Sequence, residues 1–223
     1  MVTRTLSTLL RLRVTFSYSV LLLTVATTLL ILGPAAQEQV VSRMSTNLDN
    51  LGQGHLGTLI GSAFVTETGP IWIWLPGLVC LLAIAELLWR SGRVLITFAL
   101  GHIGATLIVA AGLATAINVG WLPISVARAT DVGISYGAVA VLGALTAAVP
   151  SRWRPAWIGW WLSVGLLVVC ATADFTNGGH FVALLVGMAV SARLGSVNRW
   201  TRVRLALFVT GVAFGYLVLV NTG

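Results

Sequence analysis

The sequence predicts an all-α protein that crosses a membrane several times. Hydrophobic residues make up 57% of the chain and charged residues only 9%, whereas soluble domains carry about 25% charged residues. The apolar residues gather in runs long enough to cross a hydrocarbon core of about 30 Å as helices. No polar stretch between these runs is long enough to form a separate soluble domain.

Seven apolar runs are expected to span the membrane. The first run follows basic residues and ends in GPAAQ, but its length of about 19 residues exceeds the apolar region of a signal peptide, so we expect an uncleaved span. The fourth and sixth runs are the shortest and the richest in glycine. The expected spans are 15–33, 71–88, 94–117, 132–149, 155–173, 177–192 and 203–220.

The arginines predict the orientation of these spans. All 13 basic residues are arginine, and eleven of them lie before the first span or in alternate connections after it. Basic residues concentrate on the cytoplasmic side of membrane proteins, so the N-terminus is expected in the cytoplasm and the C-terminus outside. The short arginine clusters between apolar runs argue against a nucleic-acid partner. Arginine without lysine is typical of a GC-rich bacterial genome, and we expect a bacterial cell membrane.

Three parts follow from this topology: a basic cytoplasmic N-terminus at 1–14, a membrane core at 15–192, and an arginine-rich connection with the seventh span at 193–223. The core includes an external first loop at 34–70, in which 56–65 is expected to lie along the membrane interface. Cys80 and Cys170 lie inside apolar runs without metal-ligand spacing and are expected to be small buried hydrophobes. Six tryptophans lie near span ends, as in an aromatic belt: Trp72, Trp74, Trp89, Trp121, Trp153 and Trp200.

Two polar side chains are expected at a similar depth below the external face. A polar group inside hydrocarbon is costly and is therefore a functional candidate. His180 lies about 9 Å past Asp174 along an inward-running span, and Ser135 lies about 6 Å past Asp131 along another. His102 lies on an outward-running span at a different depth.

Glu86 is the one acidic residue within an expected span. It lies near the cytoplasmic end of that span, four residues before Arg90. An i,i+4 ion pair between the two side chains is the simplest expectation.

Small residues favour close packing of the spans that carry Ser135 and His180. Gly179, Ala183 and Gly187 recur every four residues on the sixth span, and Gly137 follows Ser135 on the fourth. Such faces let two helices approach closely in a membrane. A serine and a histidine brought into reach in this way have the geometry of a nucleophile and its general base. The alternative is that His180 only forms a structural hydrogen bond between helices.

These segments resemble the rhomboid family of intramembrane serine proteases. DFTNGGHFVALLVGMAVSA (174–192) resembles the sixth rhomboid span, and DVGISYGAVAVLGAL (131–145) resembles the fourth, with its Gly-x-Ser-Gly motif. LAIAELLWRSGRVLITFALGHIGATLI (82–108) resembles the end of the second span and the third span. The resemblance covers about residues 71–192 and implies a six-helix core with one additional C-terminal helix.

The resemblance implies that Ser135 is the nucleophile and His180 the general base of a dyad that needs no metal or cofactor. The substrate would be a transmembrane segment of another membrane protein, cut near the outer face. Rhomboids usually carry His-x-x-x-Asn in the second span to hold the oxyanion, whereas 71–85 contains no His, Asn or Gln. Candidates for that role are the Ser135 backbone N–H, Asn177 and His55, with Tyr136 and Gly133 in support.

Two further positions depart from the family pattern. Tyr136 replaces the glycine that usually follows the serine, and Val139 replaces an aromatic residue that often packs on the base. The Tyr136 ring would either narrow the cavity or take over the packing on His180. Three functions therefore stay open: an active protease, a catalytically silent rhomboid-like protein that binds membrane clients, and a small transporter.

Overall fold

The computed structural model describes residues 11–66, 71–172, 174–197 and 200–220, and these residues form helices and connecting loops without a strand. Arg4, Glu67 and Arg199, which entered the charge pattern, lie outside them. The helices at the expected spans are α2 (Arg13–Leu32), α6 (Ile71–Trp89), α7 (Ser91–Asn118), α8 (Ser135–Ala144), α9 (Arg154–Thr172), α10 (Phe175–Ser191) and α11 (Arg202–Val220). The remaining helices lie in the connections: α3 (Pro34–Met44), α4 (Leu48–Gly52), α5 (Thr58–Gly61), η1 (Ser62–Phe64), η2 (Ile124–Arg128), η3 (Leu145–Ala148) and η4 (Ser151–Trp153).

Every expected span coincides with a helix, but the helices differ in length. Five are long and apolar enough to cross a membrane, whereas the apolar helices at 135–148 and 175–191 are shorter. The protein is therefore a multi-pass helical membrane protein. The five long candidates are α2, α6, α7, α11 and the stretch Ser151–Thr172, which contains α9.

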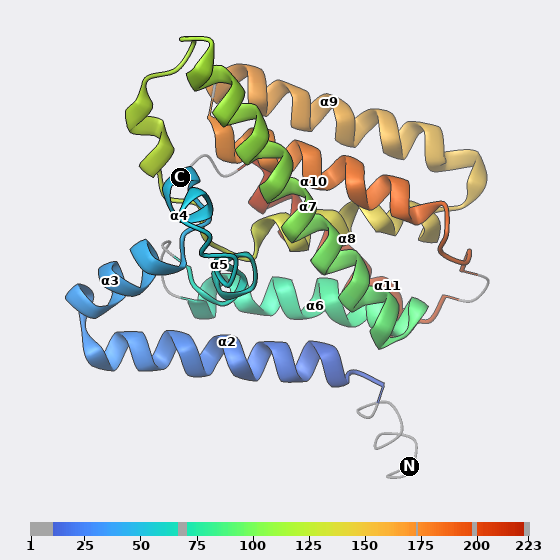
Figure 1. Ribbon diagram of the computed structural model, residues 1–223. Coiled ribbons are helices and arrows are strands. Elements are labelled where there is room, and N and C mark those ends of the chain that lie inside the picture. Colours follow the sequence, from blue (N-terminus) through green and yellow to red (C-terminus); the bar gives the residue numbers. More distant parts are fainter. Residues whose placement is uncertain (1–10, 67–70, 173, 198–199, 221–223) are drawn as a thin grey trace.

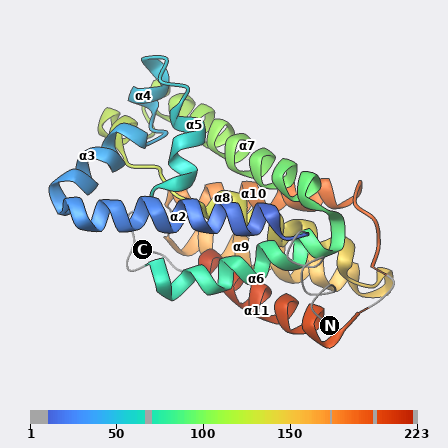
Figure 2. The ribbon, with the colours of Figure 1, turned by 90° about the horizontal axis from the view of Figure 1, so that it is seen from below.

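Helix α8 lies in the middle of the bundle (Figures 1 and 2), and nine consecutive residues of it, from Tyr136 to Ala144, are buried. It packs against α6, α7, α10 and α11. Such burial on all sides requires small residues at the contacts, because each neighbour must approach the backbone of α8 closely. Gly143 lies against the backbone of α10 at Leu184 and Gly187. An apolar helix that is surrounded by other helices shows no polar face.

Helix α11 packs along α6 and also contacts α8 and α9. Two glycines of α11 allow this: a Cβ atom on Gly211 would lie 2.8 Å from the Cα of Leu81, and one on Gly215 would lie 2.7 Å from a methyl group of Leu142. Trp157 of α9 packs its ring against Phe208 of α11, with centroids 5.8 Å apart. The last helix is therefore part of the packed bundle.

Glu86 joins the starts of two helices, which differs from the expected ion pair with Arg90. Its carboxylate accepts hydrogen bonds from the backbone N–H groups of Val14 (3.0 Å) and Thr15 (2.9 Å), from the Thr15 hydroxyl (2.7 Å) and from the Ser91 hydroxyl. The first N–H groups of a helix have no acceptor within it, so a buried carboxylate at the start of α2 supplies one. Arg90 is exposed and, with φ of 73°, forms the tight turn between α6 and α7.

Two other expectations about burial differ from the structure. Trp89 is buried rather than part of an interfacial belt, since its Nε1 donates to the carbonyl of Gly195 at 3.0 Å. Cys170 is exposed on the surface of α9 and Cys80 is half-buried, so neither is a fully buried core residue. In both cases burial depends on which side of the helix faces the bundle. A run that is apolar on all sides does not show which side that is.

Candidate functional site

His180 lies on the first turns of α10 in a largely buried position. Its Nδ1 atom is 3.4 Å from Oδ1 of Asn177, one turn earlier, and Nδ2 of Asn177 donates to the Thr172 hydroxyl at 3.0 Å. The Nε2 atom is buried and has no hydrogen-bond partner in the described part of the chain. Because buried polar atoms are nearly always hydrogen-bonded, an imidazole with one such nitrogen is a candidate for chemistry or ligand contact.

Tyr136 packs directly against this imidazole. The two rings meet edge to face, with centroids 5.4 Å apart and an interplanar angle of 83°. Gly179 makes the contact possible, because any Cβ atom there would collide with the tyrosine ring. Of the two alternatives for Tyr136, the structure therefore has the ring packed on His180.

Ser135 begins α8 and is half-buried. It lies next to Tyr136 in the chain and so starts its helix at the level of Gly179 and His180. No hydrogen bond joins the Ser135 hydroxyl to His180 among the described residues. Ile134 precedes the helix without a capping side chain, which leaves the first N–H groups of α8 available as donors.

Helices α8 and α10 run side by side in the same direction. Tyr136 contacts Gly179 near the start of both helices, and Ala140 contacts Gly187 further along. Ala183, between the two glycines, is fully buried. Gly137 faces the other way, where a Cβ atom would collide with the ring of Phe98 on α7. Three of the four small residues therefore line the α8–α10 contact, and the fourth lines the α8–α7 contact.

The chain that leads into Ser135 is held by the first loop. The backbone N–H of Thr46 donates to the carbonyl of Asp131, and the Ser45 hydroxyl accepts from the N–H of Asp131, both at 2.9 Å. The N–H of Gly133 donates to the carbonyl of Ser62 at 2.9 Å. Gly133 has φ of 124°, a conformation that strongly favours glycine. Sequence reasoning missed these loop residues, because no local pattern links them to a segment about 70 to 85 residues away.

A second serine and histidine pair lies nearby. The Ser62 hydroxyl is 3.1 Å from Nε2 of His102, and both side chains are buried. This contact fastens η1 to α7 and gives one nitrogen of His102 a partner, whereas its buried Nδ1 has none among the described residues. His102 is the histidine that was expected at a different depth from Ser135. His55 is exposed between α4 and α5, and its backbone N–H bonds to Asn50 within the loop.

The described residues contain no group of three His, Cys, Asp or Glu side chains that could hold a metal ion. The residues expected to support an oxyanion are partly engaged: the N–H of Gly133 is bonded to the loop, and one amide hydrogen of Asn177 points to Thr172. The donors left at the start of α8 are its own backbone N–H groups, which also carry the positive end of the helix dipole.

These features define a class of protein: a multi-pass helical membrane protein in which a serine begins a buried helix and a histidine lies on the parallel helix beside it. A family model described as "Rhomboid-like protein" matches residues 11–199, and the chain belongs to this family. Helix α11 lies beyond the matched residues. Comparison with curated proteins and with solved structures found no match.

Proposed function

We propose that this rhomboid-like membrane protein is an intramembrane serine endopeptidase, with Ser135 as nucleophile and His180 as general base. The observation that carries the proposal is the environment of His180, whose Nδ1 faces the Asn177 amide oxygen while the buried Nε2 has no partner among the described residues. A base oriented through one nitrogen and open at the other is the arrangement that activates a serine. Hydrogen bonds of this kind are often long before substrate binds.

The proposed reaction follows the acyl-transfer scheme. Nε2 of His180 takes the proton of the Ser135 hydroxyl as the oxygen attacks the scissile carbonyl, and the imidazolium then protonates the leaving amine. Water, deprotonated by the same nitrogen, hydrolyses the acyl-enzyme and restores Ser135. The backbone N–H groups at the start of α8 would stabilise the oxyanion. Because 71–85 lacks the usual polar donors, we expect a rate about 10² to 10³ lower than with a complete oxyanion hole.

Helix length supports a site below the membrane surface. The 14 residues of 135–148 extend about 21 Å, which is less than the hydrocarbon core of about 30 Å. With the end near Arg152 and Arg154 at one boundary, the start of α8 would lie about 9 Å inside the other. We propose seven spans with the N-terminus in the cytoplasm of a bacterial cell and the C-terminus outside. The substrate would then be a transmembrane segment of another protein, cut near the outer face.

Labelling with a fluorophosphonate probe tests the proposal. Purified wild-type protein should be labelled covalently, and both Ser135→Ala and His180→Ala should abolish the label. Ser62→Ala and His102→Ala are matched controls, because they remove the other serine and histidine pair and should leave the label in place. A label that is lost in Ser62→Ala and kept in Ser135→Ala would overturn the assignment. So would a folded wild-type protein that is not labelled while a rhomboid protease beside it labels normally.

The packing of Tyr136 favours a second candidate, a rhomboid-like protein that binds membrane clients without cleaving them. The ring packs edge to face on the buried His180, and no hydrogen bond joins the Ser135 hydroxyl to the imidazole among the described residues. A folded, unlabelled protein that still co-purifies with the same membrane proteins as Ser135→Ala would support this function.

A further inference from the structure

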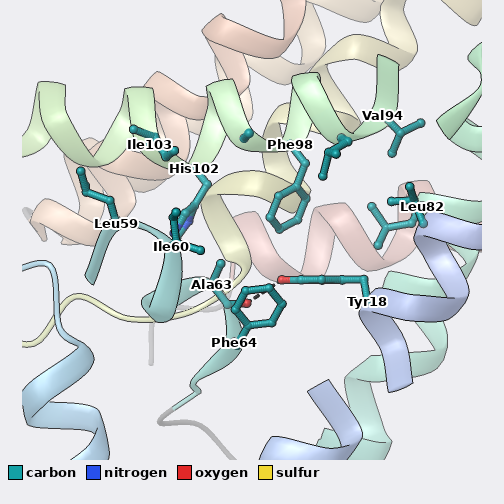
Figure 3. A pocket seen from close by; sticks show the side chains of 13 residues that line it. Tyr18, Leu59, Ile60, Ala63, Phe64, Leu82, Val94, Phe98, His102 and Ile103 are labelled. Atoms are coloured by element: carbon teal, nitrogen blue, oxygen red, sulfur yellow. Dashed lines mark hydrogen bonds between the residues drawn. The ribbon is translucent and has the colours of Figure 1, made fainter. Parts of the chain in front are cut away.

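A cavity lies between α2, α7 and the short helices α5 and η1 (Figure 3). Its volume is about 150 Å³, comparable to engineered apolar cavities that bind benzene. The side chains around it are almost entirely apolar. The main ones are Tyr18, Leu59, Phe64, Leu82, Phe98 and Ile103.

Two of the polar groups at the cavity are bonded, whereas the buried Nδ1 of His102 has no partner among the described residues. The Tyr18 hydroxyl donates to the carbonyl of Ala63 at 2.6 Å, as Figure 3 shows, and Nε2 of His102 is paired with Ser62. The surface that an occupant would meet is nonetheless almost entirely hydrocarbon. Ile60 and Leu95 line the cavity and are 65% and 56% exposed, so the slot opens to the outside of the bundle.

One end of the slot is strongly basic. Val14 and Val94 line this end. Arg13 precedes Val14 at the start of α2, Arg93 precedes Val94 in the first turn of α7, and both arginines are exposed. Arg90 is exposed in the adjoining turn. Glu86 ties the two helix starts together, and it is buried by its own hydrogen bonds, so its carboxylate does not face outward to neutralise these arginines.

An apolar slot with a basic rim has the two features that recognise an anionic phospholipid. Arginines near the membrane surface attract anionic headgroups at about 1 kcal/mol each, or about fivefold in affinity, and an acyl chain gains free energy with each CH₂ group that it buries. A second copy of the chain is a less suitable occupant, because each copy has a formal net charge of +7 and the basic ends of two copies would repel each other.

We propose that this slot binds part of one acyl chain of an anionic phospholipid, with the phosphate held by Arg13, Arg90 and Arg93. The bound lipid bridges α2 and α7 and stabilises the folded state, because it binds the folded protein and not the unfolded chain. The site is separate from Ser135 and His180 and does not depend on their chemistry.

Thermal unfolding of the purified full-length protein in nonionic detergent tests the site. Phosphatidylglycerol should raise the midpoint more than phosphatidylcholine with the same chains, and glycerol 3-phosphate, which has no chain, should have no effect. Native mass spectrometry should show a retained phosphatidylglycerol. Equal binding of the two lipids, or an equal effect of glycerol 3-phosphate, would overturn the proposal.

Variants separate the headgroup from the chain. Arg13→Gln and Arg93→Gln should each weaken phosphatidylglycerol binding about fivefold, whereas Arg152→Gln, an exposed arginine in another connection, should not. Ala99→Leu fills the slot and should expel the lipid, and Ala110→Leu on the same helix is its control. Unchanged lipid binding by Ala99→Leu would show that the lipid does not occupy the slot. A lipid-free dimer that this variant disrupts would show that a second copy of the chain occupies it.

Discussion

Replacing Glu86 with alanine should destabilise the protein strongly, because a single carboxylate serves four donors at the junction of α2, α6 and α7. Two of the donors, the N–H groups of Val14 and Thr15, have no other acceptor at the start of α2. Each buried donor left unsatisfied costs about 1 to 3 kcal/mol. Removing one partner of a buried charged network typically costs about 3 to 5 kcal/mol, and we expect Glu86→Ala to fall in this range.

The assay is equilibrium unfolding of the detergent-solubilised protein, followed by the fluorescence of its nine tryptophans. For 150–250 residues, 1 kcal/mol corresponds to about 2 to 4 °C in Tm, so the variant should melt about 6 to 20 °C below wild type. Glu86→Gln keeps one oxygen acceptor and should lie between the two. Glu38→Ala, at an exposed carboxylate, should change stability by less than about 0.5 kcal/mol. A loss below about 1 kcal/mol for Glu86→Ala would refute the reasoning.

Two further predictions concern packing and surface charge. Gly187→Ala should destabilise the α8–α10 contact by about 1 to 3 kcal/mol, because a Cβ atom there collides with the backbone carbonyl of Ala140, whereas Gly178→Ala on the same helix meets open space; equal Tm values for the two variants would contradict this. Arg128→Ala should change the Tm little, since the Arg128–Asp49 ion pair is well exposed and such pairs contribute about 0 to 1 kcal/mol. A larger loss would show that the pair holds the loop.

The helical framework was largely predictable from the sequence, and the site only in part. Each apolar run coincides with a helix, and the spacing of Gly179, Ala183 and Gly187 indicated a close helix contact. The spacing of Glu86 and Arg90 suggested an ion pair, but the carboxylate instead bonds to the start of α2, 71 and 72 residues away in the chain. Local spacing describes a helix surface and does not say which other helix covers it.

The candidate site shows the same limit. Motif spacing placed Ser135 and His180 at one level, and their helices lie side by side. The sequence left two positions open for the Tyr136 ring, one that narrows the cavity and one that packs on His180. Residue order alone does not distinguish them. The support of His180 by Asn177 lies within one turn of a helix, yet only the side-chain conformations show that the two atoms face each other.

By itself, the sequence determined that this protein is helical, lies in a membrane and carries a serine and a histidine on two small-residue helices. These are local properties, since hydrocarbon accepts only segments that satisfy their own backbone hydrogen bonds. The tertiary structure alone decided that Ser62 bonds to His102, that the first loop holds the chain before Ser135, and that a slot lies between α2 and α7. Each of these contacts joins residues far apart in the chain, and its formation depends on how the packed helices are turned toward one another.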